Sequence, residues 1–555
     1  MSMKPQGLEP IPQATMSLAR KSSPKGTVIM RLRDAVGPIY QDDHFVHLFS
    51  KRGRPAEAPW RLALVTVFQA MENLTDRQAA QMVALRIDWK YALSLELEDE
   101  GFDYTVLSQF RQRLLEHGSA ELVLEPLLAV CREQGWLKAG GKQRTDATHV
   151  LACVRSLSSL ESVGETLRAS LNAIAEVEPQ WLRAQMDEEW FDRYVHRFEL
   201  ARLPKAESKR EELRQHVGRD GLRLLKVSQQ PQAPQAVREL PQIQLLQQVW
   251  QQHYEEVDGQ IRWRDGPAVA NAQRVVSPYD PDARSSRKRE TEWFGYKSHV
   301  TETCDEDPNA LHLIVLVETT PATTADEEVL APLLAKERQQ GLAPEEMYVD
   351  MGYTSAEQLV EQACLGTRII GPVAGTTTWQ QRQQNGFAPQ DFQLDWQEQV
   401  AICPQGQRSQ RWRQGQDKRG KPITVIQFAK TGCAACPVRA FCTHSQDGRT
   451  LTLGREPSQL ALEQRRKEQV TPAFQQKYAR RAGIEATISQ AVRTSGLRQA
   501  RVRGQDKVHV QHVQIAAAIN LMRIDTWLLA QQKELPARRP RPRSPFARLQ
   551  EREAG

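Results

Sequence analysis

The stretch that decides the fold begins with His312-Leu-Ile-Val-Leu-Val-Glu-Thr319 and ends with Glu346-Met-Tyr-Val-Asp-Met351. Its first part is a continuous apolar, β-branched run, which is typical of a central strand. Residues 327–340, between the two parts, have the composition of a helix. Upstream, residues 295–303 alternate between apolar and polar side chains, as in a half-buried strand. Strands that alternate with a helix in this way predict an α/β layer.

Around this layer the sequence predicts an α+β protein of several domains, because 555 residues are too many for one typical domain. Helix caps and apolar spacing favour an all-helical N-terminal domain, either a helix-turn-helix reader of DNA or a plain helical bundle. A Gln-rich segment, residues 229–252, favours a linker or an exposed connection. The expected parts are a flexible leader (1–30), the helical domain (31–135), an α/β core (140–530) and a basic disordered tail (531–555). Two insertions are expected to interrupt the core: a helical and Gln-rich one (155–260) and a basic, cysteine-bearing one (375–465).

Composition and motifs exclude several classes of protein. No run reaches the roughly 20 apolar residues of a membrane span, and the N-terminus lacks the apolar core of a signal peptide. Eight cysteines in so long a chain do not suggest a disulfide scaffold, so we expect a reducing, cytoplasmic location. Phosphate-binding loops, HExxH motifs and dinucleotide fingerprints are absent, so nothing supports a nucleotide cofactor. The net charge of +6 suits a nucleic-acid partner but does not by itself indicate one.

Two aspartates occupy positions that need an explanation. Asp146 lies in the middle of an expected strand, although aspartate is a poor strand former. Asp350 lies at the carboxyl end of a strand, where α/β sheets place their sites, and Gly352 allows a sharp turn just after it. A strand end or a turn is the alternative explanation for either residue.

Glu485 is the third candidate acid, on a helix expected over about 472–495. At 100° per residue, Tyr478, Arg481 and Glu485 share one face of that helix. A surface Arg–Glu pair is the plain alternative. Gly483 favours a functional role over a plain surface pair, because glycine costs about 1 kcal/mol in a helix interior. A glycine is expected there if a large group approaches the helix. Three such carboxylates could hold two Mg²⁺ ions roughly 3.5–4 Å apart at a phosphodiester.

These residues resemble the DDE transposases of bacterial insertion sequences, in the branch with a Tyr-x2-Arg-x3-Glu-x6-Lys signature. The signature falls on Tyr478, Arg481 and Glu485, and the aspartates lie in Thr-Asp146-Ala-Thr and Tyr-Val-Asp350-Met-Gly-Tyr. One position departs from the signature, since residue 492 is Val rather than Lys and the nearest basic residue is Arg493. Similar patches, over roughly residues 31–530, are Asp76-Arg-Gln-Ala-Ala, Trp89-Lys-Tyr-Ala-Leu, Gly496-Leu-Arg-Gln-Ala-Arg-Val-Arg-Gly and Ala517-Ala-Ile-Asn-Leu.

The resemblance implies an RNase H-like core, with Asp146 and Asp350 on neighbouring strands and Glu485 on a following helix. It implies Mg²⁺ or Mn²⁺ held by these three carboxylates, and DNA phosphates bound by Tyr478, Arg481 and Arg493. The implied activity is endonuclease cleavage at the ends of a mobile element, followed by strand transfer into target DNA.

The implied partners are double-stranded DNA, carrying terminal inverted repeats or the target, and a second copy of the chain, since two ends must be brought together. The protein would act in the cytoplasm, on the nucleoid. Two alternatives stay open: an RNase H-like nuclease that does not join strands, and an inactive, transposase-derived DNA-binding regulator, which Val492 favours.

A separate motif is Cys433-Ala-Ala-Cys436-Pro-Val-Arg-Ala-Phe-Cys442, with Cys403 upstream. Four thiolates in this layout could close a tetrahedral structural zinc site, with His444 as a substitute ligand. A redox pair and ordinary free cysteines are the alternatives. The basic surroundings suggest contact with DNA phosphates, and a solvated charged loop is the alternative there. The basic residues are Arg408, Arg411, Arg413, Lys418, Arg419 and Lys421.

Overall fold

A computed structural model of the chain describes residues 2–5, 7–266, 268–307, 309–375, 378–383, 385–418 and 420–532. These residues form two compact units. One unit comprises the described residues of the ranges 1–110, 309–313 and 517–555, and the other those of 111–308 and 314–516. The predicted basic tail, from residue 533 onwards, lies outside the described residues, as does Arg419.

The first unit is helical, as the sequence predicts. Its N-terminal helices are α1 (Gln13–Ser22), α2 (Val28–Val36), α3 (Pro59–Met71), α4 (Asp76–Leu85), α5 (Ile87–Leu93) and the first part of α6 (Thr105–Glu116). Helix α4 begins with a capping box, in which the Thr75 side chain accepts from the backbone of Gln78 and the Gln78 side chain from that of Thr75. Helix α3 is buried along nearly its whole length, including Trp60 and Phe68.

The flexible leader expected over residues 1–30 is wrong for its second half, which contains α1 and the start of α2. The Pro and Ser content suggested a loop, but Ala19 is buried against Met30 and Tyr91. The buried Thr15 hydroxyl also donates to the Leu95 carbonyl at 2.8 Å. Tertiary packing of one apolar face therefore stabilises a helix that composition alone does not favour.

The second unit is built on a mixed sheet. Its strands are β1 (Lys142–Leu151), β4 (Arg284–Lys288), β5 (Thr291–Thr303), β6 (Ile314–Pro321), β7 (Glu346–Tyr348) and β8 (Arg368–Ile370). Strand β5 is antiparallel to β1, β4 and β6, whereas β1–β7 and β7–β8 are parallel pairs. The path through the five main strands is β6-β5-β1-β7-β8, so the first strand of the chain lies in the middle of the sheet.

Strand β6 differs from the expectation of a central strand, because among the described strands it pairs with β5 alone. Its apolar side chains are nevertheless buried, since helices cover them. Leu316 packs against Val329 and Leu333 of α14 (Asp326–Gln339). On the same strand, the Thr319 hydroxyl lies 2.7 Å from Nδ1 of the buried His512, in α22 (Gln505–Gln531). A fully apolar run therefore indicates that a strand is buried on both faces. An edge strand that helices cover is buried in the same way.

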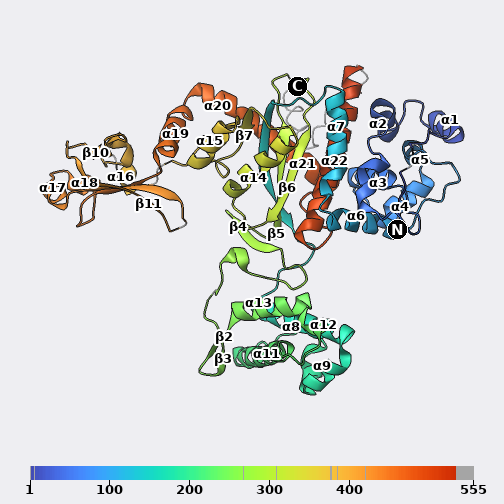
Figure 1. Cartoon of the computed structure of the whole chain (residues 1–555), viewed down its shortest axis with the longest axis horizontal. Helices are drawn as coiled ribbons and strands as arrows, with labels where there is room; N and C mark the ends of the chain where they lie inside the picture. The colour runs from blue at the N-terminus through green and yellow to red at the C-terminus, as the bar shows by residue number, and fades with distance from the viewer. Residues whose placement is uncertain are drawn as a thin grey trace, which may run out of the picture. The chain divides into compact units, whose positions relative to one another are not determined.

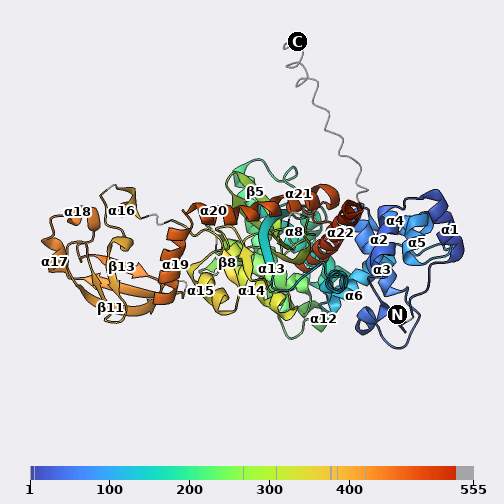
Figure 2. The same ribbon diagram turned by 90° about the horizontal axis from the view of Figure 1, so that it is seen from above.

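Helices α14, α15 (Ala356–Cys364) and α21 (Gly483–Ser495) flank the sheet (Figure 1 and Figure 2). Leu330 and Leu334 of α14 pack on Met347 and Val349 around β7. By length and composition alone, helix α22 is long and apolar enough to cross a membrane, although the sequence contains no uninterrupted run of roughly 20 apolar residues. However, 61% of its most apolar window is buried inside the protein, as in the core helix of a soluble protein.

The insertion predicted over residues 155–260 is a helical layer with its own core. It contains α8 (Ser159–Val177), α9 (Pro179–Gln185), α10 (Glu189–Tyr194), α11 (Glu207–Ser228), α12 (Gln235–Arg238), α13 (Pro241–His253) and the hairpin of β2 (Tyr254–Val257) and β3 (Gln260–Trp263). The linker expected over 229–252 is wrong in its second half, which forms α13. Among its glutamines, Ile243, Leu246, Val249 and Trp250 recur at helical spacing and are buried.

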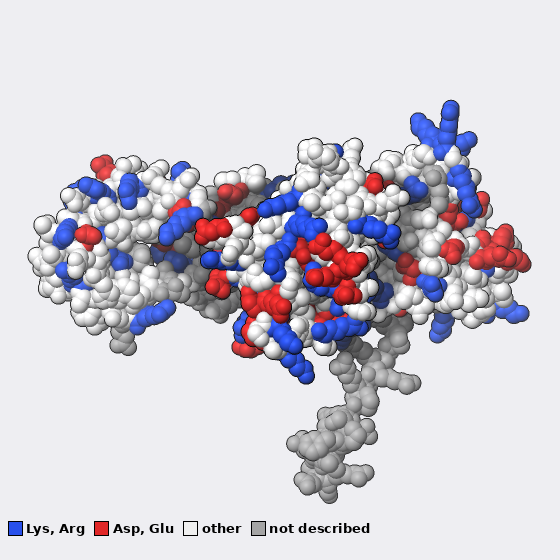
Figure 3. All heavy atoms as spheres, turned by 90° about the horizontal axis from the view of Figure 1, so that it is seen from below, with Lys and Arg blue, Asp and Glu red and all other residues white. Residues whose placement is uncertain are grey.

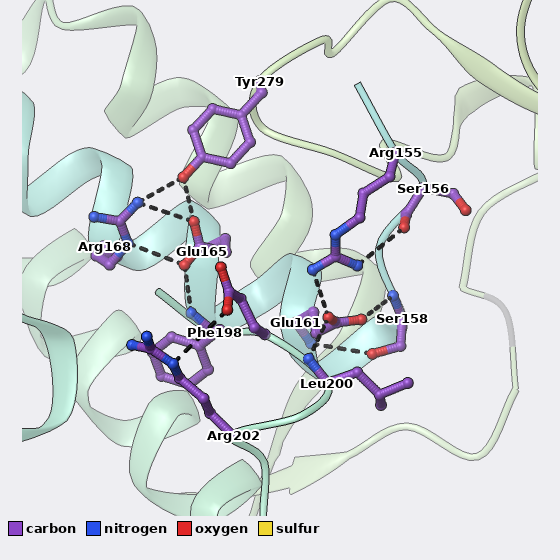
Figure 4. A network of polar contacts seen from close by, with 11 residues as sticks. Arg155, Ser156, Ser158, Glu161, Glu165, Arg168, Phe198, Leu200, Arg202 and Tyr279 are labelled. Carbon is purple, nitrogen blue, oxygen red and sulfur yellow. Dashed lines mark hydrogen bonds and ion pairs between the residues drawn. The ribbon is translucent and has the colours of Figure 1, made fainter. Parts of the chain in front are cut away.

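Two buried glutamates of α8 hold a neighbouring loop of this insertion in place (Figure 4). Glu165 accepts the backbone N–H of Phe198 at 2.5 Å, and Glu161 accepts that of Leu200 at 2.7 Å. Arg168 and Tyr279 complete the hydrogen bonds of Glu165, and Arg155 donates to Glu161 at 2.7 Å. Buried carboxylates need such partners, so the loop and α8 depend on each other for stability.

The second insertion contains small sheets. Strands β9 (Gln393–Asp395) and β10 (Val400–Ile402) form one, and β11 (Ser409–Gln416), β12 (Pro422–Phe428) and β13 (Thr450–Leu453) form the other. Short helices α17 (Lys430–Ala434) and α18 (Arg439–Cys442) lie between β12 and β13. The chain then returns to the main sheet through α19 (Glu456–Glu468) and α20 (Pro472–Tyr478). The predicted insertion is thus a strand-containing subdomain, with a core around Phe392, Ile426 and Leu451.

Candidate active site

Strand register brings the two aspartates together. Strands β1 and β7 run parallel, with Arg144 opposite Tyr348. Two residues further along each strand direction lie Asp146 and Asp350, so the pairing places them side by side at the point where β7 has ended. Burial is the largest cause that raises the pKa of Asp146, and the negative charge of Asp350 adds to this rise.

Asp146 is held by a backbone amide and by an arginine. Its Oδ1 accepts the N–H of Ala147 at 2.8 Å, and its Oδ2 lies 2.5 Å from Nη2 of Arg481. Burial raises the pKa of Asp146, and this effect outweighs the lowering by Arg481 and the Ala147 N–H. Any cation that binds here therefore gains from neutralising a carboxylate with little access to water.

Asp350 begins a tight turn. Its Oδ1 accepts the N–H of Gly352 at 2.8 Å. A Cβ atom at position 352 would lie 3.0 Å from that oxygen and 3.2 Å from Oδ2 of Asp326, closer than side chains normally approach. Glycine is thus needed for space beside two carboxylates, rather than for a left-handed backbone conformation.

Glu485 joins this group through Arg481. Its Oε1 lies 3.2 Å from Nη1 of Arg481, whose other terminal nitrogen binds Asp146. The Glu485 side chain is 66% exposed, whereas those of Arg481 and Asp146 are 17% and 13% exposed. The guanidinium therefore bridges an acid on the sheet and an acid on α21.

The continuous helix expected over 472–495 is interrupted. Residues Ala479–Ala482 form a 3-10 turn between α20 and α21. At this turn Arg144 of β1 approaches the helix, and its Nη1 donates to the carbonyl of Arg480 at 2.7 Å. A Cβ atom on Gly483 would lie only 1.9 Å from that Nη1. The large group expected beside Gly483 is thus an arginine of the protein's own sheet.

Arg144 belongs to a buried polar cluster that sequence reasoning missed. Its Nε donates to Glu302 of β5 at 2.7 Å, and the Glu302 side chain is fully buried. Thr487 of α21 donates to the second oxygen of Glu302 at 2.6 Å. These bonds join β1, β5 and α21, and so fix Glu485 above the sheet. The sequence signal that could have revealed this cluster is a charged residue at each of the strand positions 144 and 302, which face the core.

A second missed cluster lies beside Asp350. Lys297 of β5 donates to Asp326 at 2.8 Å and to the Thr324 carbonyl at 2.7 Å. The buried His299 lies 2.6 Å, through Nδ1, from the hydroxyl of Tyr353. Burial, aided by the charge of Lys297, lowers the pKa of His299 to about 4, so this ring is neutral at pH 7.

Tyr478 lies close to the acids, and Arg493 does not. Burial raises the pKa of Tyr478, and the charges of Asp350, Asp146 and Glu485 all add to that rise. Its ring stacks on Phe474 with 5.9 Å between centroids. Arg493 is exposed about two turns beyond Glu485, and its Nε donates to the Ser489 carbonyl of its own helix. The structure thus groups five of the six residues predicted for this site.

The carboxylates form a donor set that suits a hard divalent cation, since all their donor atoms are carboxylate oxygens. Among the described residues, however, no three His, Cys, Asp or Glu side chains are placed closely enough to hold a metal ion. Arg481 lies where the acids would converge, and it already supplies a positive charge there. The acids therefore fit a cation, provided that this guanidinium moves aside.

The four cysteines predicted as zinc ligands also gather in space. Cys403, Cys433, Cys436 and Cys442 line one cavity, and all are free thiols. His444 does not line that cavity but stacks on Trp379, with ring centroids 4.0 Å apart.

Of the neighbouring basic residues, Lys421 pairs with Glu327 at 2.7 Å. On the face of the molecule shown in Figure 3, Lys and Arg border groups of Asp and Glu, so neither sign forms a continuous field there.

Comparison with known families matches two separate segments of the chain. Residues 402–525 match the family described as a transposase DDE domain, and residues 18–113 match the transposase domain DUF772. The first match includes Tyr478, Arg481 and Glu485, whereas the two aspartates lie before it. No curated protein and no solved structure matches the chain.

The matched segments are similar to transposase domains: one lies in the N-terminal helices, and the other begins after the last strand of the mixed sheet and includes the helix that carries Glu485. Both family models describe transposases, and the one matched by residues 402–525 is a DDE domain, so the chain is similar to DDE transposases over these two segments.

Proposed function

We propose that Asp146, Asp350 and Glu485 are the acid triad of a DNA-cleaving and DNA-joining enzyme. The observation that carries this proposal is the β1–β7 register, which brings Asp146 beside Asp350 although more than 200 residues separate them. The strand path β6-β5-β1-β7-β8 and the helix that carries Glu485 support an RNase H-like core, in which two acids lie on neighbouring strands.

The three carboxylates would hold Mg²⁺ or Mn²⁺, which supplies Lewis-acid polarisation of the phosphodiester and lowers the pKa of bound water. Asp146 must be ionised for this role. Its raised pKa therefore favours neutral or weakly alkaline conditions for activity. Tyr478 and Arg481 lie close enough to the acids to bind phosphate oxygens of the DNA, Arg481 through its planar pair of N–H donors. Arg493, further along α21, would contact the backbone outside the reacting phosphate.

The reaction would consist of two phosphoryl transfers. In the first, water attacks a phosphodiester at the element end, and the leaving 3′-oxygen takes up a proton. In the second, that 3′-hydroxyl attacks a target phosphodiester and displaces another 3′-oxygen, so the number of phosphodiester bonds is unchanged. The substrates would be terminal inverted repeats and target DNA, acted on by a homodimer that brings two ends together, in the cytoplasm.

The test compares the full-length protein with Asp350→Asn, which removes the charge but keeps an oxygen to accept the Gly352 N–H. DNA that carries the gene's own flanking sequence is incubated with Mg²⁺ or Mn²⁺ and run on a denaturing gel. We expect specific cuts from the wild type, at least a 1000-fold loss in Asp350→Asn, about the magnitude for loss of a group that stabilises the transition state, and near-equal DNA binding by both.

Glu290→Gln is the matched control, because this carboxylate is 97% exposed and outside the site. Equal cutting by Asp350→Asn and the wild type would contradict the triad. Cuts without joined products would favour the nuclease alternative. Binding without any cuts would favour an inactive regulator, which is the reading that Val492 supports.

A further inference from the structure

Four of the eight cysteines lie in the strand-containing insertion and line the same cavity. Cys403 follows β10, Cys433 lies in α17, Cys436 follows that helix, and Cys442 ends α18. All four line a single cavity of about 30 Å³. A volume of that size holds one or two water-sized occupants, and so has room for a single ion.

Backbone amides already point at two of the sulfurs. The N–H of Gln407 donates to Sγ of Cys403 at 3.3 Å, and the N–H of Arg449 donates to Sγ of Cys433 at 3.4 Å. The Cys403 N–H in turn donates to the Gln407 carbonyl at 2.9 Å, which closes a tight turn around the first sulfur. Donors aimed at sulfur stabilise a thiolate, which is the form that binds a metal.

The insertion has a small apolar core. Its core comprises six buried apolar residues: Phe392, Ala401, Ile426, Phe428, Leu451 and Leu453. Cys403, Cys433 and Cys442 pack directly against that core. A subdomain with so small a core commonly needs a disulfide or a metal to be stable, and these cysteines form no disulfide.

We propose that Cys403, Cys433, Cys436 and Cys442 bind one structural Zn²⁺, which fixes the loops at one end of the β11–β12–β13 sheet. As placed, the thiols surround the cavity but do not converge to the roughly 2.3 Å of a zinc–sulfur bond. Side-chain rotation must bring them in. On binding, each ligand loses its proton to solvent and no electron is transferred, so the step needs no oxidant or reductant.

The test measures metal on the full-length protein rather than activity, so its outcome is independent of the acid triad. Protein purified without chelators is expected to hold about one equivalent of zinc by elemental analysis. Zinc should be released when all thiols are titrated with a mercurial reagent. Reconstitution of metal-free protein with Co²⁺ should give the visible bands of a tetrahedral tetrathiolate site.

The variant Cys436→Ser should lose at least 90% of the zinc, whereas Cys364→Ser, an exposed cysteine outside the insertion, should retain it. Chelation of zinc from the wild type should lower its melting temperature and expose four additional thiols to alkylation. Protein that contains no zinc and gives no cobalt spectrum would overturn the proposal. A Cys433–Cys436 disulfide found by mass spectrometry would overturn it equally.

Discussion

At the scale of single residues, the guanidinium of Arg481 lies between two acids, 2.5 Å from Asp146 Oδ2 and 3.2 Å from Glu485 Oε1. Its Nε is buried and has no hydrogen-bond partner among the described residues. An arginine with one unsatisfied donor is not in its best environment, because an unpaired buried donor costs roughly 1–3 kcal/mol. A DNA phosphate would offer Arg481 a second, fully paired position.

We therefore expect Arg481→Ala to bind Mn²⁺ more tightly than the wild type in the absence of DNA. Removing the competing cation leaves the acids uncompensated, and we expect about a tenfold gain in affinity, equivalent to about 1.4 kcal/mol. Calorimetric titration at a weakly alkaline pH, which favours the ionised form of Asp146 because its pKa is raised, measures this. Arg493→Ala should bind Mn²⁺ like the wild type. Unchanged or weaker affinity in Arg481→Ala would show that the guanidinium does not compete with metal.

Gly483 permits the close approach of Arg144. Alanine is ordinarily favoured over glycine in a helix by about 1 kcal/mol, yet its Cβ here would lie 1.9 Å from Arg144 Nη1. We expect Gly483→Ala to destabilise the protein by about 1–3 kcal/mol, as overpacking does, and to lower cleavage by displacing Glu485. Chemical denaturation measures the first effect. Gly415→Ala, where no atom lies within 4 Å, is the control, and equal stability of the two variants would refute the argument.

At the scale of elements, helix α8 is tied to its surroundings by ionised glutamates (Figure 4). Burial tends to raise the pKa of Glu161, but hydrogen bonds from Arg155 and Ser158 and the charge of Arg155 lower it to about 2. An unfolded glutamate titrates near pH 4.3. Because the folded pKa is the lower one, Glu161 stabilises the fold above about pH 4.3, and this stabilisation is lost as the pH falls towards 2.

Glu161→Gln should therefore unfold more readily than the wild type at pH 7, and the difference should shrink between pH 4 and pH 2.5. Denaturant unfolding followed by circular dichroism, at pH 7 and at pH 2.5, measures this difference in stability. Glu199→Gln changes a glutamate that is 45% exposed in the same insertion and controls for the loss of charge. A Glu161→Gln deficit that is independent of pH would assign the effect to shape rather than ionisation.

The sequence predicted single elements better than their boundaries. Helix α14 and strand β7 follow from local periodicity, and Asp146 within β1 was recognised as anomalous because aspartate is rare in strands. The break between α20 and α21 could not be predicted from local sequence, because Arg144, which donates to the backbone at this break, lies more than 330 residues away. Helix α13 was missed because its glutamines obscured the helical spacing of its four buried apolar residues.

The same distinction applies to the site. Side-chain types and signature spacing led to Tyr478, Arg481 and Glu485, since these residues are close in sequence. The supporting residues Glu302 and Thr487 carry no local signal, as their roles arise only where β5 and α21 meet. Sequence patterns therefore identify groups within one segment, whereas pairing between segments needs the tertiary structure.

At the scale of the whole molecule, three kinds of part share one chain: a helical unit, an acid-bearing sheet, and two insertions with separate buried cores. Both insertions lie between acids of the proposed triad along the sequence, the helical one after Asp146 and the cysteine-bearing one after Asp350. The pairing of β1 with β5 and β7 is made by residues outside both insertions.

This arrangement has a consequence during synthesis on the ribosome. Strand β1 ends at Leu151, whereas its first partner, β5, begins at Thr291. At roughly 5–20 residues per second, β1 leaves the ribosome on the order of ten seconds before a partner exists. Both of its edges are open to wrong pairing during that time. The helical insertion emerges in the same interval and can collapse around its own core, so the nascent protein completes a peripheral layer before its central sheet.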